Sequence, residues 1–429
     1  MHRDFDLNLT HLTKIEGAAS VELRVRNNKV EHVYFKTTEY KRFFTQGMIG
    51  KPYVVLPQYL ARICGTCSNA HILCSIKACE NALDIIPSEQ TMVLRDLVMD
   101  GMIIRDHALH LYLFVLPDLF SKDSFLDFDD SDHLQHQLLH DGFDIKAAGS
   151  YLSEIVAGRI VHGVFPVIGG FVGFPKKQEI KQAILKLEKI RPAVLRLIKV
   201  FEDCDFKFDR QTNFVALTPS EYGFLRGKIL TGKGRYIEEK NFRDYFEKTI
   251  LPYSQAAAFK HEGSPYLVGA LARMNFAKDN LGPETKKSLG KTLSSFPSTN
   301  VFYNNLAQAI EILHCLDHAV NVLKTVKIAD EKPVDAKLKQ STGIGIIEAP
   351  RGTLYHEVIL GNQGKVLGGE VVVPTQQNQL SIERDIAALV ETFLPQASQE
   401  KILFEMEKLV RAYDPCMSCA AHFLKVKWL

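Results

Sequence analysis

Four cysteines, arranged as two Cys-x-x-Cys pairs, are the residues of this sequence best suited to metal chemistry. The first pair is Cys64 and Cys67, and the second is Cys416 and Cys419, close to the other end of the chain. Thiolates are soft ligands, so four of them brought together predict a metal site. About 350 residues separate the two pairs, so the fold must bring distant parts of the chain together to build such a site.

Two other uses of these cysteines are open. A structural zinc site also accepts four thiolates, but zinc ribbons usually close within a few tens of residues. A thioredoxin-type redox pair needs only one Cys-x-x-Cys after a strand and gives no reason for two. The wide separation and the duplication therefore favour a larger metal centre over either alternative.

The residues around both pairs resemble the large subunit of the nickel-iron hydrogenases. The upstream pair lies in Arg62-Ile-Cys-Gly-Thr-Cys-Ser-Asn-Ala-His71, and the downstream pair lies in Asp414-Pro-Cys-Met-Ser-Cys-Ala-Ala-His422. Both motifs are specific, and the resemblance runs the whole length of the chain. The run from Val410 to Cys416 is most similar to the soluble cytoplasmic hydrogenases and sulfhydrogenases of archaea.

The resemblance implies that all four cysteines hold nickel. Cys67 and Cys419 would also bridge to an iron that carries cyanide and carbon monoxide. The implied reaction is the reversible heterolytic cleavage of dihydrogen into two protons and two electrons. Dihydrogen has no charge and no polar handle, so a metal must bind it and a base must take the proton. A hydrogen-sensing or low-turnover homologue is the alternative function.

Three further side chains are implied in the reaction itself. Glu16, in a Lys-Ile-Glu-Gly run, matches the glutamate that relays protons from a nickel-bound thiolate, although Lys14 stands where arginine is usual. Arg351 matches the arginine that overhangs the open metal position, and Asp118 is expected to orient it. If Glu16 is buried beside the sulfurs, desolvation should raise its pKa toward the working pH.

Further residues are implied around the metals. His71 would donate toward a thiolate sulfur, as outer groups commonly do around metals, and Pro374-Thr375 matches a segment that hydrogen-bonds a diatomic ligand. His422 would bind a second cation, magnesium or iron. The family shares that cation with a glutamate after Arg-Phe-Phe, where this chain has Thr45. The cation site is therefore expected to be weakened, or completed by another acid such as Glu39.

Other chains are expected to complete the enzyme. The remaining cysteines lack the spacing of a ferredoxin-type cluster motif, so a small subunit should carry the iron-sulfur clusters. The sequence has no dinucleotide-binding or Walker motif, so a flavin or nicotinamide would bind on further diaphorase subunits. The resemblance also implies nickel-insertion proteins and a maturation endopeptidase, which would cut after His422 and release residues 423–429.

Composition argues against several other classes of protein. The chain has 429 residues, a formal net charge of +2, 46% hydrophobic and 24% charged residues, as expected for a globular protein. The low net charge and the lack of basic runs give no argument for nucleic acid or a membrane surface. No apolar stretch reaches 18 residues, so we expect no membrane span. The cysteines lack disulfide-like spacing, which favours a reducing cytoplasm.

The expected fold class is α+β, mainly α, with a central bundle of long helices and small peripheral β-hairpins. Residues 1–429 are expected to form a single large catalytic domain. Within it, alternating polarity predicts a hairpin region at 8–40, and helical spacing predicts the bundle at 56–204 and 304–328, with a bend or break at Pro192. The remaining expectations are an irregular cover at 208–290, a second hairpin at 354–375, and a final helix with the metal motif at 398–422.

Overall fold

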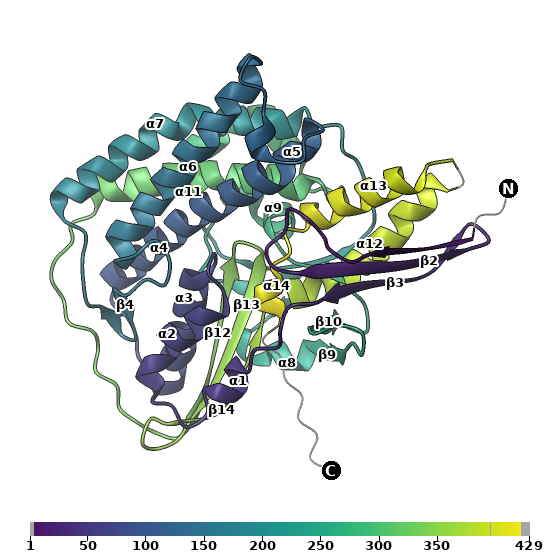
Figure 1. Ribbon diagram of the computed structural model, residues 1–429. Helices are drawn as coiled ribbons and strands as arrows, with labels where there is room; N and C mark the ends of the chain where they lie inside the picture. Colours follow the sequence, from purple (N-terminus) through teal and green to yellow (C-terminus); the bar gives the residue numbers. More distant parts are fainter. Residues whose placement is uncertain (1–3, 395, 422–429) are drawn as a thin grey trace, which may run out of the picture.

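Long helices fill one side of the molecule, and small sheets lie beside and below them (Figure 1). The computed structural model describes residues 4–394 and 396–421. The expected α+β class, mainly helical with small antiparallel sheets, is confirmed. Within these two described ranges, no helix is long and apolar enough to cross a membrane.

Four long helices form the bundle: α4 (Glu89–Ala108), α6 (His133–Ala157), α7 (Lys177–Glu202) and α11 (Tyr303–Thr325). Each buries an apolar stripe against its neighbours, as the helical spacing predicts. α7 continues through Pro192 as one helix, so the chain is not interrupted there. α4 and α6 approach closely, because a Cβ added at Gly149 would lie 2.8 Å from the backbone nitrogen of Arg105.

α4 continues into a wider helical turn. Residues Leu109–Val115 form a π-helix, and α5 (Leu116–Leu119) follows. The π-helix carries the buried His110, whose Nδ1 lies 2.6 Å from Oε1 of Gln308 and whose Nε2 lies 2.8 Å from the backbone oxygen of Arg411. Such wide turns often occur at functional sites, and this one ties the bundle to the segment that carries the second cysteine pair.

A three-stranded antiparallel sheet supports the first cysteine pair. Its strands are β12 (Ser341–Ala349), β13 (Gly352–Leu360) and β14 (Val366–Val372). α3 (Ser68–Leu83) lies on β12, where a Cβ added at Gly343 would come within 2.0 Å of the Ala78 oxygen. The sequence predicts the β13–β14 hairpin, at 354–375, but not β12, whose glycines lower its strand propensity.

The N-terminal sheet lies in the expected hairpin region. It contains β1 (Phe5–Leu9), β2 (Ala19–Arg26) and β3 (Lys29–Thr37). The β2–β3 turn places Asn27 at φ 52° and Asn28 at φ 59°, the left-handed backbone that asparagine tolerates. β3 packs on α12 (Pro374–Phe393), a helix that the sequence analysis does not predict. Residues 10–18 join β1 to β2, and we call them the Glu16 loop.

The expected irregular cover between residues 208 and 290 consists of short elements. They are β6 (Asn213–Thr218), β7 (Lys228–Thr231), β8 (Tyr236–Ile237), α8 (Phe242–Tyr245), β9 (Phe246–Ile250), β10 (Ala257–His261), β11 (Tyr266–Leu267), α9 (Ala270–Ala277) and α10 (Pro283–Leu289). Four short elements precede them: α1 (Phe44–Gly47), α2 (Leu56–Leu60), β4 (Pro166–Val167) and β5 (Gly170–Phe171).

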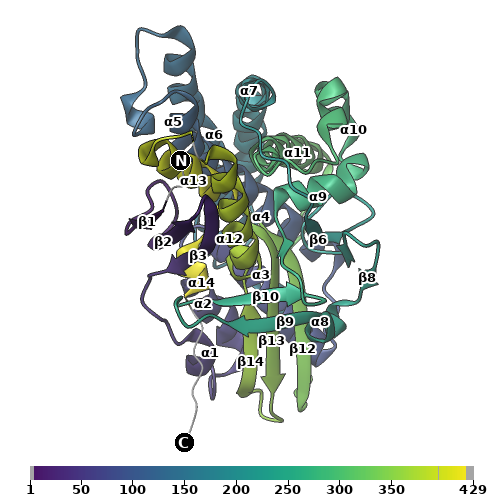
Figure 2. The same cartoon turned by 90° about the vertical axis from the view of Figure 1, so that its right-hand side faces the viewer.

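Elements from both ends of the chain meet in the centre (Figure 2). The predicted final helix is present as α13 (Gln399–Ala412), and the short α14 (Met417–Ala420) follows it. α14, in yellow, lies beside β3 and above α1 and α2 in this view. The backbone nitrogen of Met417 donates to the oxygen of Glu16 at 2.9 Å, so the Glu16 loop is paired directly with the C-terminal motif.

Candidate metal centre

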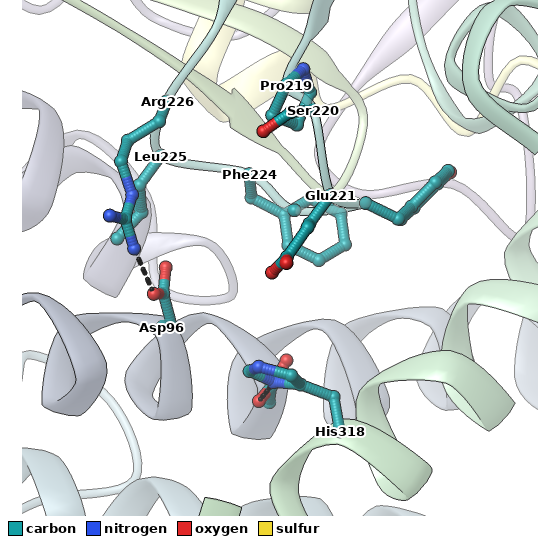
Figure 3. A pocket seen from close by; sticks show the side chains of 11 residues that line it. Asp96, Pro219, Ser220, Glu221, Phe224, Leu225, Arg226 and His318 are labelled. Carbon is teal, nitrogen blue, oxygen red and sulfur yellow. Dashed lines mark hydrogen bonds and ion pairs between the residues drawn. The ribbon is translucent and has the colours of Figure 1, made fainter. Parts of the chain in front are cut away.

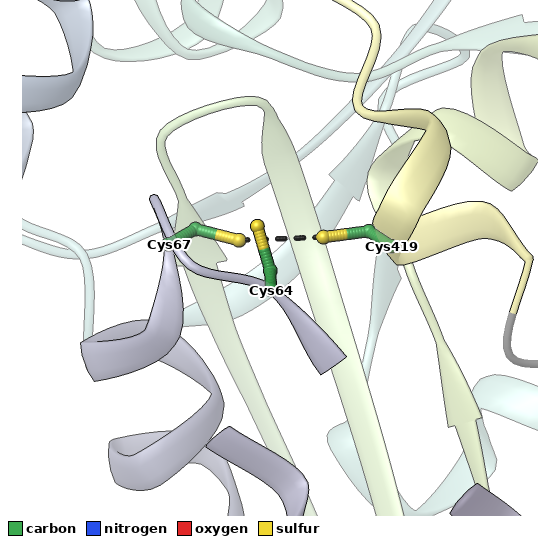
Figure 4. Close-up of side chains that lie close together, drawn as sticks. All are labelled: Cys64, Cys67 and Cys419. Atoms are coloured by element: carbon green, nitrogen blue, oxygen red, sulfur yellow. Dashed lines mark hydrogen bonds between the residues drawn. The ribbon is translucent and has the colours of Figure 1, made fainter. Parts of the chain in front are cut away.

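Both cysteine pairs converge in the interior of the protein. The Cys64 sulfur lies 3.5 Å from the Cys416 sulfur, and the Cys67 sulfur lies 3.4 Å from the Cys419 sulfur. All four side chains are buried. Figure 4 shows Cys67 and Cys419, which comes from the C-terminal segment, pointing toward one another, with the Cys64 sulfur between them in this view. The predicted convergence of the two pairs is therefore confirmed.

The local backbone explains how each pair is presented. Cys64 has an extended backbone and follows a short 3-10 turn, and Cys67 is the N-cap residue that directly precedes α3. Both cysteines therefore lie in the turn before α3, which starts at Ser68. The N-terminus of α3 adds partial positive charge, which favours a nearby thiolate. On the other side, α13 ends at Ala412, Pro415 prevents it from continuing, and Cys416 is the N-cap residue of α14.

Burial and mutual contact shift the pKa values of the clustered thiols in opposite directions. Burial raises the pKa of the Cys416 and Cys419 thiols well above the usual range. Hydrogen bonds from Cys416, Cys419 and Cys67, with the charge of Arg351, hold the pKa of Cys64 well below it. Several buried thiolates cannot persist together without a compensating cation, so the donor set fits a bound metal.

Glu16 lies directly beside the sulfurs, as predicted. Its Oε2 is 2.8 Å from the Cys416 sulfur, which donates to it, and 3.2 Å from the donating backbone nitrogen of Ser418. Burial, followed by the negative charge of Cys64, raises the pKa of Glu16. The expected direction of this shift is confirmed, and its main cause is desolvation.

Arg351 also lies at the site, held by two carboxylates. It occupies the tight turn between β12 and β13, and its Nε donates to Oδ1 of Asp414 at 3.0 Å. Its Nη1 donates to Oδ2 of Asp106 at 3.2 Å. Its Nη2 is buried and lies 3.0 Å from the same Asp414 oxygen, without the alignment of a hydrogen bond. One guanidinium nitrogen is thus left able to donate to a further group.

The expectation that Asp118 orients Arg351 is wrong. Asp118 accepts from Arg411 and Lys14 instead, while Asp106 and Asp414 hold Arg351. Two signals in the sequence point to the correct pair. Asp106 directly precedes the His107-x-x-His110 run, and Asp414 opens the second cysteine motif. Asp118, which follows His107 by eleven positions, lies in α5 beyond the π-helix and contacts the Glu16 loop through Lys14.

The remaining predicted groups surround the sulfurs. His71 Nε2 lies 3.8 Å from the Cys419 sulfur, and His71 Nδ1 lies 3.1 Å from Nε2 of His356, a β13 residue that the sequence analysis missed. The Thr375 hydroxyl accepts from the Cys416 backbone nitrogen at 2.9 Å. A small cavity of about 10 Å³ is lined by Cys67, His71, Ala349, Pro350, Arg351, Leu354, Pro374, Thr375, Cys416 and Cys419.

The expected second-cation site is only partly described. His422 and residues 423–429 lie outside the described residues. Thr45 lies on α1, and the Glu39 carboxylate accepts from the Ala18 backbone nitrogen at 2.9 Å. Glu39 is also close to Gly17, because a Cβ added there would lie 3.0 Å from its Oε1. The contribution of Glu39 to a cation site therefore stays a prediction.

A second, more open cavity of about 190 Å³ lies between α4, α11 and residues 219–226 (Figure 3). Asp96 lies on its wall, paired with Arg226 at 2.8 Å, and burial raises the pKa of Asp96 to about 6. His318 faces it from α11, and the charge of Asp100 raises the pKa of His318 to about 9. None of the four clustered cysteines, Glu16 or Arg351 lines this cavity.

Comparison with known proteins identifies the family. The family model for nickel-dependent hydrogenases matches residues 50–140 and 236–422. The alpha subunit of sulfhydrogenase 2 from Pyrococcus furiosus is 32% identical over 425 residues, which cover 98% of this chain and 100% of that subunit. This chain belongs to the nickel-dependent hydrogenase family. It is the catalytic large subunit of a nickel-iron hydrogenase, an oxidoreductase that acts on dihydrogen.

Other relatives agree with this assignment. The alpha subunit of P. furiosus sulfhydrogenase 1 is 29% identical to this chain, over 98% of each protein. The fold matches an NAD+-reducing [NiFe]-hydrogenase in the H2-reduced state with a TM-score of 0.85 at 22% identity, covering 98% of this chain and all of that one. The expected similarity to archaeal sulfhydrogenases is confirmed by the two Pyrococcus subunits.

Proposed function

We propose that Cys64, Cys67, Cys416 and Cys419 hold the nickel-iron centre at which this hydrogenase cleaves dihydrogen reversibly. The observation that carries the proposal is the pairing of sulfurs from both ends of the chain at 3.5 and 3.4 Å in a buried site. When bound, the centre supplies the metal that dihydrogen requires, since no side chain splits it alone. Cys67 and Cys419 are the proposed bridges to an iron that carries cyanide and carbon monoxide.

Glu16 is the proposed proton acceptor. Its carboxylate lies at hydrogen-bonding distance from the Cys416 sulfur, so a proton on this sulfur can pass to Glu16 without rearrangement. A raised pKa suits the task, because the carboxylate then holds a proton more readily than an ordinary surface glutamate does. The backbone nitrogen of Ser418 donates to the same oxygen and so keeps it oriented toward the Cys416 sulfur.

Arg351 provides a fixed positive charge over the small cavity. Asp106 and Asp414 leave its guanidinium little freedom, and its Nη2 remains able to donate. A guanidinium held in this way stabilises negative charge beside the sulfurs without the cost of reorganisation. Thr375, Pro374 and His71 line the same cavity, and we propose that the diatomic ligands lie there. His71 is also within reach of the Cys419 thiolate.

A small subunit with iron-sulfur clusters is the proposed electron partner, and we propose that it docks near residues 158–162. Ile160 and Val161 are exposed apolar side chains, with 39% and 38% of their surface accessible. Arg105 donates to the backbone oxygens of Ile160 and of Thr66, which lies between the first two cysteines. Arg105 therefore joins this surface to the segment between Cys64 and Cys67, so an iron-sulfur cluster of a subunit docked there would lie near the four sulfurs.

Further parts of the assembly remain proposals. A diaphorase subunit with flavin or nicotinamide is the proposed electron acceptor, and the cytoplasm is the proposed location. The cytoplasmic location agrees with the eight free cysteines, seven of which are buried. Nickel-insertion proteins and an endopeptidase that removes residues 423–429 are the proposed maturation partners. A magnesium or iron ion near His422 is proposed as a second cation, weakened by Thr45 unless Glu39 contributes.

Replacement of one cysteine tests the assigned function. We expect Cys419→Ser to abolish hydrogen-dependent dye reduction in the purified complex, because an alcohol does not replace a bridging thiolate. Cys204→Ser is the matched control: Cys204 lies outside the cluster, and this variant should keep its activity. Dye reduction by Cys419→Ser at the parental rate would reject the ligand assignment.

A further inference from the structure

Asp118 lies between two cations on the side of the Glu16 loop. Its side chain is buried, with 2% of its surface accessible. Nη1 of Arg411 lies 2.8 Å from both carboxylate oxygens, and Nζ of Lys14 donates to Oδ1 at 2.8 Å. A buried carboxylate with such partners is a rigid anchor, because moving Asp118 or Arg411 separates two buried opposite charges.

Arg411 connects this anchor to the Glu16 loop. Its Nε donates to the backbone oxygen of Thr13 at 3.1 Å, and its Nη2 donates to the Thr13 hydroxyl at 3.0 Å. Nη2 also lies 3.1 Å from a carboxylate oxygen of Glu407, one turn earlier in α13. The guanidinium therefore uses all three nitrogens, and two of them hold the backbone and side chain of a residue three positions before Glu16.

The loop itself is bent sharply on both sides of Glu16. Lys14 has φ 56°, a left-handed backbone that a lysine adopts only when its surroundings hold it there. Gly17 has φ 80°, and a Cβ added to it would lie 2.9 Å from Cβ of Met417. Glu16 is thus suspended between a polar anchor at Thr13 and Lys14 and a close backbone contact with the C-terminal motif.

We propose that Asp118, Arg411 and Lys14 form a clamp that positions the Glu16 carboxylate against the Cys416 sulfur. The inference rests on the proposed function of Glu16 as proton acceptor. No described contact joins the clamp to a cluster sulfur, so its members are positioning residues. Arg411 also precedes the second cysteine motif by a few positions. The clamp therefore fixes the proton acceptor to the same segment that delivers Cys416, and keeps the 2.8 Å contact between them.

A double-mutant cycle tests the clamp in the nickel-loaded complex. The readout is the rate of hydrogen–deuterium exchange with solvent, divided by nickel content. We expect Asp118→Asn to slow exchange about 10- to 100-fold, as loss of supporting groups around metal sites commonly does. Combined with Glu16→Gln, it should cause no further loss, because both changes act through one carboxylate. Asp141→Asn, which breaks a similar bidentate pair with Arg196, should keep the parental rate.

The possible outcomes separate the clamp from the relay. If Glu16→Gln is slow but Asp118→Asn is not, or if the two losses multiply, the clamp is rejected. A parental rate for Glu16→Gln rejects the relay and the clamp together. If Asp118→Asn does not assemble, Lys14→Met replaces it, because 15% of the Lys14 side chain is accessible and its loss is better tolerated. Lys14→Met should slow exchange and Lys14→Arg should restore it; an unchanged Lys14→Met rate rejects the clamp.

Discussion

Two side chains at the sulfurs have different proposed roles: Glu16 accepts the proton, and Arg351 supplies a fixed positive charge. Glu16 accepts from the Cys416 sulfur, while Arg351 is held by Asp106 and Asp414. The carboxylate is tuned by burial, and the guanidinium is fixed by its partners. A mobile proton and a fixed positive charge are therefore kept on different groups, which suits a heterolytic reaction.

The first prediction concerns Glu16. Glu16→Gln keeps the shape of the side chain but removes its ability to take a proton, so nickel content should stay at the parental level. Hydrogen–deuterium exchange with solvent should fall about 10²- to 10⁴-fold, the usual contribution of a positioned acid or base. Gas exchange followed by mass spectrometry measures this rate. Parental exchange by a fully nickel-loaded variant would mean that protons leave by another group.

The sequence identifies the residues of the motifs but not all of their partners. The sequence identifies the four cysteines, Glu16 and Arg351 because each lies within a recognisable local motif. Asp118 is misassigned, and His356 is missed, because side chains that come from remote elements meet only after folding. The π-helix adds to the difficulty, since it shifts the helical register between His107 and Asp118.

At the scale of elements, close contacts between helices set the position of the Arg351 anchor. Asp106 lies near the end of α4, and α4 packs on α6 through glycines. A side chain at the crossing would push the helices apart and move Asp106 with them. Packing in the bundle is thus linked to the geometry of the metal site.

The second prediction tests this crossing. A Cβ in Gly149→Ala would lie 2.8 Å from the Arg105 nitrogen and from a methyl group of Ile104, closer than such atoms can approach. We expect the free energy of unfolding to fall by about 1–3 kcal/mol, the usual range for overpacking. Gly65→Ala is the control, because a Cβ added at Gly65 meets no atom within 4 Å. Gly50→Ala is unsuitable, because Gly50 has φ 81°. Denaturant titration of the three proteins measures the difference, and equal midpoints would contradict it.

The third prediction concerns the ion pair between α4 and α11. His318 Nδ1 lies 2.7 Å from Asp100, which raises the pKa of His318 from 6.5 to about 9. Because the folded-state pKa is the higher one, the pair stabilises the fold fully below about pH 6.5 and loses this effect as the pH rises through 9. His318→Gln should therefore be destabilising at pH 6 and much less so at pH 10. Denaturation midpoints at both pH values decide it, and a pH-independent difference would refute the linkage.

Periodicity explains which elements were predictable. The Asn27-Asn28 hairpin and α11 follow from clear alternation and clear helical spacing. β12 is hidden by its glycines, which are needed for contact with α3, and α12 is hidden by a polar first turn whose residues are buried against the metal motif. In both cases tertiary contacts, rather than local propensity, decide the structure.

At the scale of the whole molecule, the fold brings the two ends of the chain to one buried point, and the proposed docking surface lies beside it. Ile160→Glu places a charge on the exposed apolar surface anchored by Arg105. The fourth prediction is that less small subunit co-purifies with the Ile160→Glu variant than with the parental chain, because a buried charge in an interface is costly. Leu185→Glu on exposed α7 is the control. Equal recovery of the small subunit with both variants would move the interface elsewhere.

The most direct test of the account is the nickel content of the purified active complex and of cysteine variants from each end of the chain. We expect one nickel per large subunit in the parental protein, only traces of zinc, and loss of nickel in both Cys64→Ser and Cys416→Ser, because the two sulfurs belong to one site. Zinc in place of nickel, or nickel retained after either replacement, would contradict it.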